Sequence, residues 1–126
     1  CFDRAYTCLY TAGFRKETLR FQTIGTYVGS TRDDWSSAPG FTSVLEDRDR
    51  SLLAQTSLSC VFQQIPFTFG MKGPVFSVDT GCSAALVAYN IAHTSIRRSE
   101  TGQIVSGLDV NLTDALVLGS NLIHSV

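Results

Sequence analysis

The chain has 126 residues, a length that suits one compact domain with a buried core. Hydrophobic residues make up 44% of it and charged residues 17%, which excludes an intrinsically disordered protein. The formal net charge is −1, so no electrostatic attraction to nucleic acid or to an anionic membrane surface is expected. No apolar run approaches the ~20 residues of a membrane-spanning helix, and we predict no such span.

The first third of the chain is expected to hold a helix and a buried strand. From Phe2 to Ala12 apolar residues recur at three- and four-residue steps, and Gly13 follows where a helix stop is expected. The segment from Thr23 to Ser30 is rich in β-branched and aromatic residues, with Gly25 and Gly29 as interruptions. We interpret this segment as a central strand without a chemical role.

The middle of the chain is predicted to be a polar loop followed by a second helix. Thr31 to Arg50 contains Asp33-Asp34-Trp35, and paired aspartates can serve acid–base or metal chemistry. No histidine or further carboxylate stands at ligand spacing, so we interpret this segment as a surface loop. Leu52 to Ile65 places apolar side chains on one broad face, which predicts a helix that Pro66 ends or kinks.

The stretch from Gly73 to Glu100 is predicted to be a strand, a turn and a helix with a thiol at the apex. The apolar run Val75-Phe76-Ser77-Val78 indicates a short buried strand, and Asp79-Thr80-Gly81 indicates a tight turn. A helix of small residues is expected to begin at or just after Cys82. This is the layout of a nucleophile elbow, with cysteine in place of serine.

A cysteine at that position suits covalent catalysis because the thiolate is the form that attacks carbon. A free thiol has a pKa of about 8.5, which a helix N-terminus can lower to roughly 3.5–7.5. The unpaired amides of the first helical turn favour negative charge on sulfur, and a backbone amide at Cys82 can also donate to a thioester oxygen as it becomes an oxyanion. The alternative interpretation of Cys82 is core filler, since free cysteine is often buried.

The other cysteines and the histidines are assigned no chemistry. Cys1, Cys8 and Cys60 form neither a C-x2-C metal spacing with Cys82 nor a disulfide framework, so we expect no bound metal and a reducing, cytoplasmic location. His93 lies about three turns beyond Cys82, too far to be its base, and His124 lies near the chain end. No signal peptide is visible, but the chain opens on cysteine rather than methionine. We therefore expect a fragment, with organellar targeting left open.

The last part of the chain continues the predicted alternation of strands and helices. The helix after Cys82 is apolar almost all round, as expected of a helix buried between layers, and Gly102 is its predicted stop. Gln103 to Leu108 is predicted to be the next strand, whereas Ala115 to Leu118 fits either a helix or a strand. Alternating strands and helices predict an α/β layered fold with a parallel sheet.

The sequence of the segment around Cys82 resembles that of a known protein family. Gly73-Pro74, followed by Ser77-Val78-Asp79-Thr80-Gly81-Cys82-Ser83-Ala84-Ala85-Leu86-Val87-Ala88, is similar to G-P-S-x-x-V-D-T-A-C-S-S-S-L-V-A of β-ketoacyl synthases, above all the condensing domains of type I polyketide and fatty-acid synthases. Gly25 to Ser30 resembles the family's G-V-F-V-G-x strand, and Gly107 to Leu112 resembles its G-G-V-N-L segment. The chain departs from the family at Gln63 to Phe67, where Asn-Arg-Ile-Ser-Tyr is usual.

The resemblance implies a fold, a reaction and partners. Residues 1–126 would form part of the N-terminal half of a thiolase-like, layered α/β/α ketosynthase domain. Cys82 would take an acyl group from a phosphopantetheine thioester on an acyl carrier protein, and a malonyl thioester would then extend it by decarboxylative Claisen condensation. The resemblance implies no bound cofactor. It also implies a homodimer that pairs through Val75 to Asp79.

The family's two catalytic histidines have no match in this sequence. They lie in H-G-T-G-T and N-x-G-H segments, and His93 and His124 fit neither. We therefore expect the parent protein to condense and these 126 residues alone not to. Two alternatives stay open: a thiolase-fold acyltransferase or non-condensing acyl-binding protein, and a non-catalytic interaction subunit.

Overall fold

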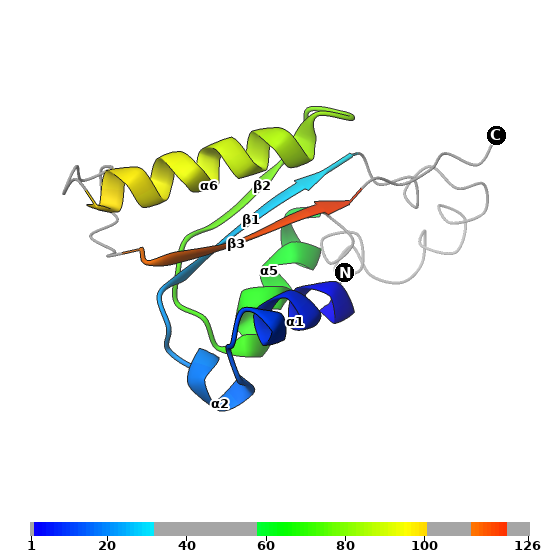
Figure 1. Ribbon diagram of the computed structural model, residues 1–126. Coiled ribbons are helices and arrows are strands. Elements are labelled where there is room, and N and C mark those ends of the chain that lie inside the picture. The colour runs from blue at the N-terminus through cyan, green and yellow to red at the C-terminus, as the bar shows by residue number, and fades with distance from the viewer. Residues whose placement is uncertain (1, 32–57, 101–111, 121–126) are drawn as a thin grey trace, which may run out of the picture.

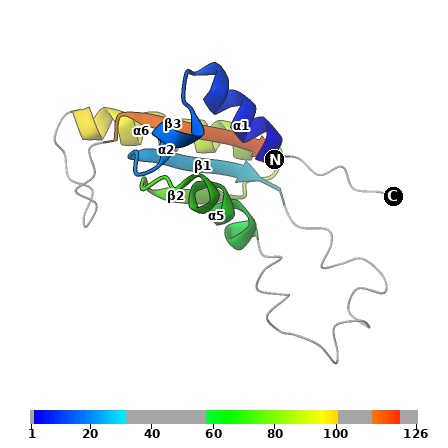
Figure 2. The same cartoon turned by 90° about the horizontal axis from the view of Figure 1, so that it is seen from below.

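Three parallel strands form a sheet with helices on both faces (Figures 1 and 2). The computed structural model describes residues 2–31, 58–100 and 112–120. In these ranges the elements are α1 (Phe2–Thr11), α2 (Lys16–Leu19), β1 (Ile24–Ser30), α5 (Leu58–Phe69), β2 (Val75–Val78), α6 (Ala84–Glu100) and β3 (Asp114–Ser120). Helix α6 covers one face of the sheet, and α1 and α5 cover the other. The predicted α/β architecture with a parallel sheet is confirmed.

Strand β1 is the centre of the sheet. The strand order is β2-β1-β3, and all seven residues of β1 are buried, which confirms the prediction of a central strand from Thr23 to Ser30. In the register, Gly29 of β1 stands beside Val78 of β2 on one side and Gly119 of β3 on the other. Both pairings are parallel, so the carboxyl ends of the three strands lie at the same edge of the sheet.

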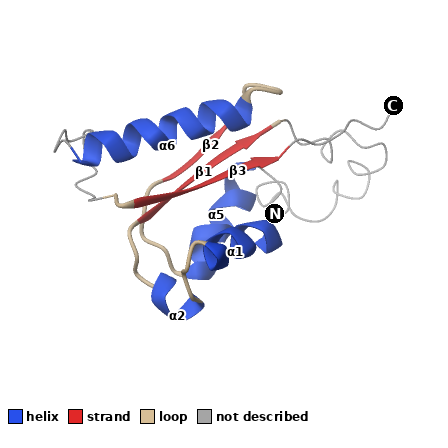
Figure 3. Cartoon of the chain, viewed as in Figure 1, coloured by secondary structure: helices blue, strands red, loops and turns tan. Residues whose placement is uncertain are grey.

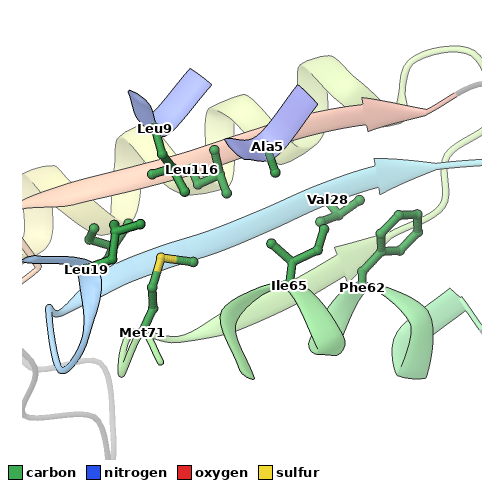
Figure 4. Close-up of a cluster of buried hydrophobic side chains, with 9 residues drawn as sticks. Ala5, Leu9, Leu19, Val28, Phe62, Ile65, Met71 and Leu116 are labelled. Carbon is green, nitrogen blue, oxygen red and sulfur yellow. The ribbon is translucent and has the colours of Figure 1, made fainter. Parts of the chain in front are cut away.

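The larger hydrophobic core lies between the sheet and the helices α1 and α5 (Figure 4). Every second residue of β1 faces it, because side chains alternate between the faces of a strand. Burial of each large aliphatic or aromatic side chain contributes roughly 1.5–3 kcal/mol, so this cluster stabilises the packing of α1 and α5 on the sheet. Its buried members are Ala5, Leu9, Leu19, Ile24, Val28, Phe62, Ile65, Met71 and Leu116.

A second core lies between the sheet and α6. It contains Tyr27, Ala88, Ala92 and Leu112, and the Tyr27 ring stacks on Phe76 with 5.7 Å between ring centroids. Alanines at four-residue steps along α6 let the helix approach the sheet closely. This packing fixes the axis of α6 over the central strand.

Helices α1 and α5 end in the same way. After α1, the Phe14 amide donates to the Leu9 carbonyl and the Gly13 amide to the Tyr10 carbonyl, with Gly13 at a φ of 91°. After α5, Met71 and Gly70 repeat this pattern, with Gly70 at a φ of 71°. Such paired bonds around a left-handed glycine are a Schellman motif. Gly13 is thus confirmed as a helix stop.

Three expectations from the sequence are corrected. Of the two effects predicted for Pro66, an end or a kink, the end is wrong: helix α5 continues to Phe69, because Gly70 supplies its end. Strand β2 is partly exposed rather than buried, with Phe76 45% exposed, because it lies at one edge of the described sheet. Helix α6 is buried on one side only, and Leu86 on its other side is 71% exposed.

The choice left open for Ala115 to Leu118 is settled as a strand, since these residues lie in β3 and pair with β1. The predicted strand at Gln103 to Leu108, most of the segment Gly107 to Leu112 and the stop at Gly102 lie outside the described residues. So do the loop with Asp33 and Asp34 and the first residues of the helix expected from Leu52. Among the described helices, none is long and apolar enough to cross a membrane.

Candidate active site

The loop between β2 and α6 lies at the carboxyl edge of the parallel sheet (Figure 3). Ligands of open parallel α/β sheets commonly bind at this edge. Strand β2 ends at Val78, and α6 begins at Ala84, so five residues, Asp79 to Ser83, join the two elements. Cys82 lies in this connection two residues before the helix, as the sequence predicted.

The turn itself is held by Asp79. Its Oδ1 accepts a hydrogen bond from the Gly81 amide at 3.0 Å, which is an Asx turn. Gly81 has a φ of 66°, in the left-handed region that favours glycine. A Cβ added to Gly81 would meet no atom within 4 Å, so the backbone conformation, not a lack of space, is what favours glycine here.

Ser83 closes the connection onto the helix. Its hydroxyl donates to the Thr80 carbonyl at 2.9 Å and lies 3.0 Å from the Thr80 hydroxyl. The Ala84 amide donates to the Gly81 carbonyl, and the Ser83 carbonyl accepts the Val87 amide at 3.1 Å, which starts the helical ladder. Because these bonds link residues on both sides of Cys82, the position of Cys82 follows that of the first turn of α6.

Cys82 carries a free, exposed thiol. Exposure contradicts the alternative interpretation of this residue as core filler. The first amides of an α-helix lack intrahelical partners and carry the positive end of the helix dipole, so negative charge near the start of α6 is favoured. An exposed thiol beside such donors can attack a thioester carbonyl, and a neighbouring amide can receive the resulting oxyanion.

The structure places His93 and Cys8 away from the thiol, whereas Cys1 and His124 lie outside the described residues. His93 is exposed on α6, stacked against Tyr89 with 6.4 Å between ring centroids. It lies nine residues beyond Ala84, about 13 Å along the helix at ~1.5 Å per residue. Cys8 is also free and exposed, but it lies on α1, on the opposite face of the sheet. In the described ranges, no three His, Cys, Asp or Glu residues could hold a metal ion.

Sequence reasoning named Cys82 but missed the roles of its neighbours. The hydrogen bonds of Asp79, Thr80 and Ser83 shape the loop around Cys82. The spacing Asp-x-Gly was the available signal, since an aspartate that accepts from the amide two residues on is a common turn pattern. Gly29 was interpreted as an interruption of β1, although it contacts the start of α6.

Comparison with known proteins finds one matching family model. The model described as "Beta-ketoacyl synthase, N-terminal domain" matches residues 1–120. Among curated proteins, the highly reducing polyketide synthase aurA of Calcarisporium arbuscula is 29% identical over 97% of this chain, and polyketide synthase GfsA of Streptomyces halstedii is 33% identical over 83%. The highly reducing polyketide synthase easB of Emericella nidulans is 34% identical over 86%.

These matches cover little of the relatives themselves. The chain spans 5% of aurA, 1% of GfsA and 4% of easB. Among solved structures, the ketosynthase from module 6 of the bacillaene synthase of Bacillus subtilis 168 matches with a TM-score of 0.62 and 22% identity. That match covers 79% of this chain and 15% of the solved one, and it shows a shared fold.

Proposed function

The chain belongs to the β-ketoacyl synthase family, as part of its N-terminal domain, and from this premise we propose that Cys82 is the nucleophile of a condensing enzyme of polyketide synthesis. The observation that carries the proposal is the exposed thiol of Cys82, held at a strand-to-helix connection at the carboxyl edge of the sheet. The curated relatives named above are polyketide synthases, which favours a polyketide product over a fatty acid.

The first half-reaction would transfer an acyl group to Cys82. The thiolate attacks the carbonyl carbon of an acyl thioester carried on the phosphopantetheine arm of an acyl carrier protein. The carbonyl oxygen becomes an oxyanion that accepts hydrogen bonds from the Cys82 amide and from the start of α6. The bond between the carbonyl carbon and the carrier's sulfur then breaks, and the carrier leaves as a thiol after gaining a proton. The acyl group is now a thioester of Cys82.

The second half-reaction would extend the acyl chain by two carbons. A malonyl thioester loses carbon dioxide, and the electron pair left behind forms an enolate. The enolate carbon attacks the acyl carbon on Cys82, a carbon–carbon bond forms, and the Cys82 thiolate leaves. The family's two histidines would assist decarboxylation and stabilise the enolate. Since neither histidine segment occurs in this sequence, we expect the 126 residues alone not to condense.

The proposal is tested by chain extension in the full-length protein. We expect Cys82→Ala to abolish malonyl-dependent extension, because no thiol remains at this position to form the acyl thioester. Cys8→Ala is the matched control, since it removes the other described free, exposed thiol without touching the loop. Extension by the Cys82→Ala protein at the wild-type rate would overturn the assignment.

A second candidate function is acyl transfer without condensation. It rests on the same exposed thiol of Cys82, because loading of that thiol does not require the family's two histidines. The two functions differ in the step after loading. If the full-length protein forms an acyl-Cys82 thioester but releases no extended product when malonyl thioester is added, acyl transfer is the better assignment.

A further inference from the structure

On the face of the sheet beneath α6, a row of large side chains is followed at the carboxyl edge by a row in which two of the three residues are glycine. Tyr27 of β1 and Phe76 of β2 stack under the middle of the helix, and Val117 of β3 lies in the same register row. Two residues further along the strands, in the row at the carboxyl edge, β1 and β3 both carry glycine. Gly29 and Gly119 are direct partners in the β1–β3 ladder, and we call them the glycine pair.

The first turn of α6 rests on this glycine pair. A Cβ added to Gly29 would overlap the carbonyl carbon and oxygen of Ala84 and lie 2.5 Å from the Ala85 amide nitrogen. A Cβ added to Gly119 would lie 2.7 Å from the Cβ of Ala85. Separations this short do not occur between real Cβ atoms and their neighbours. Any larger residue in the glycine pair would therefore push the start of α6 away from the sheet.

Gly29 adjoins both ends of the loop that carries Cys82. Through the sheet ladder it stands beside Val78, the last residue of β2, and through packing it meets Ala84, the first residue of α6. Only five residues lie between Val78 and Ala84, and hydrogen bonds among them restrict the conformation of this loop. A shift of Ala84 relative to Val78 must therefore change the position of Cys82.

We propose that Gly29 and Gly119 are positioning residues, which set the height of the first turn of α6 over the sheet and so place the Cys82 sulfur and the oxyanion-binding amides relative to an acyl thioester. The inference rests on the proposed function of Cys82. A misplacement of about 1 Å at a reacting group can cost about 100-fold in rate. The role proposed for the pair is geometric, because it acts through the first turn of α6.

The test compares glycine variants of the full-length protein by the rates at which Cys82 reacts with iodoacetamide and with a small acyl thioester. Tryptic cleavage gives the peptide Gly73–Arg97, in which Cys82 is the only cysteine, so mass spectrometry reports this thiol alone. We expect Gly119→Ala to slow acylation about 10- to 100-fold and to lower kcat more than it raises KM. Gly29→Ala is expected to act in the same direction.

Two further variants separate positioning from general damage. Ala85→Gly removes the methyl group that a side chain at position 119 would meet, so the double variant Gly119→Ala with Ala85→Gly is expected to recover acylation. Gly25→Ala has a conflict with a side chain, as Gly119→Ala does, but at the opposite end of β1, where a Cβ would lie 2.6 Å from the Tyr27 ring. It is expected to lower the unfolding temperature while leaving the kcat and KM of acylation unchanged.

The inference fails if folded Gly119→Ala protein is acylated at the wild-type rate, or if Ala85→Gly does not restore the rate that Gly119→Ala lowers. In Gly29→Ala the new Cβ would overlap backbone atoms of α6, which can prevent folding. The test is therefore decided by Gly119→Ala and its rescue by Ala85→Gly. Acylation of Cys82 in the wild type with no effect of the glycine variants rejects the positioning role alone. Lack of any acylation of wild-type Cys82 rejects the proposed function instead.

Discussion

At the scale of single residues, the loop around Cys82 is shaped by side chains that do no chemistry themselves. Asp79 holds the Gly81 amide, and Ser83 links the turn to the helix. The β-ketoacyl synthase motif has alanine at the position of Gly81. The φ of Gly81 is 66°, a left-handed conformation that costs alanine free energy. The chain therefore reaches this backbone conformation with less strain than an alanine would allow.

Replacement of Gly81 by alanine is expected to lower the free energy of unfolding by about 1 kcal/mol, the cost of a left-handed conformation. The open space around Gly81 means that no steric conflict adds to this cost. Urea unfolding measures the change. Gly13→Ala is the matched control, because Gly13 also has a positive φ and open space but lies far from Cys82. A loss of several kcal/mol at Gly81 alone would contradict the conformational explanation.

At the scale of elements, the packing of α6 on β1 includes a buried polar group without a partner. The Tyr27 hydroxyl is buried and makes no hydrogen bond of ordinary geometry, while its ring stacks on Phe76. Burial raises the pKa of Tyr27 above its ordinary value, and the nearby Ser95 hydroxyl opposes the shift only in part. A neutral phenol is thus favoured in the folded protein.

Tyr27→Phe is expected to retain the free energy of unfolding or to raise it by about 1 kcal/mol, because an unsatisfied buried hydroxyl is removed and the ring stack is kept. It should also reduce the loss of folding stability that the wild-type protein shows as the pH rises above 10. Above pH 10 the unfolded chain ionises Tyr27 before the folded chain does, so wild-type stability falls as the pH rises. Denaturant unfolding at pH 8 and pH 10.5 checks both effects. A destabilisation of several kcal/mol would mean that the hydroxyl is satisfied.

The elements show which features a sequence can specify. The buried strand β1, the start of α6 and the thiol between β2 and α6 were predicted, because β-branched residues, small-residue helices and turn residues act locally. The edge position of β2 was missed, since an apolar run does not reveal how many neighbours a strand has. The glycine pair was equally hidden, because Gly29 and Gly119 are 90 residues apart and meet only through the strand register.

At the scale of the whole molecule, two apolar surfaces are left open by the described residues. One is the outer side of α6, where Leu86 is 71% and Tyr89 59% exposed, and the other is the edge strand β2. We propose that a second copy of the chain pairs along β2, because the edge strand of the described sheet presents unpaired backbone groups.

The dimer proposal predicts that Ser77→Glu shifts the full-length protein from dimer toward monomer, since the exposed Ser77 of β2 would place a carboxylate in the contact. Light scattering coupled to gel filtration measures the molar mass. Thr11→Glu is the matched control, because Thr11 is likewise exposed but lies on α1, which contacts β3 at the other edge of the described sheet. Equal dissociation by both changes, or by neither, would contradict pairing along β2.

The role of Cys82 is tested most directly by locating the acyl group after the full-length protein is incubated with a small acyl thioester. Trypsin releases Cys82 in the peptide Gly73–Arg97 and Cys8 in the peptide Ala5–Arg15, each with a single cysteine. We predict that peptide mass spectrometry finds the acyl mass on Gly73–Arg97 and not on Ala5–Arg15. An unmodified Cys82 peptide, or equal labelling of the two peptides, would contradict the assignment of Cys82 as the nucleophile.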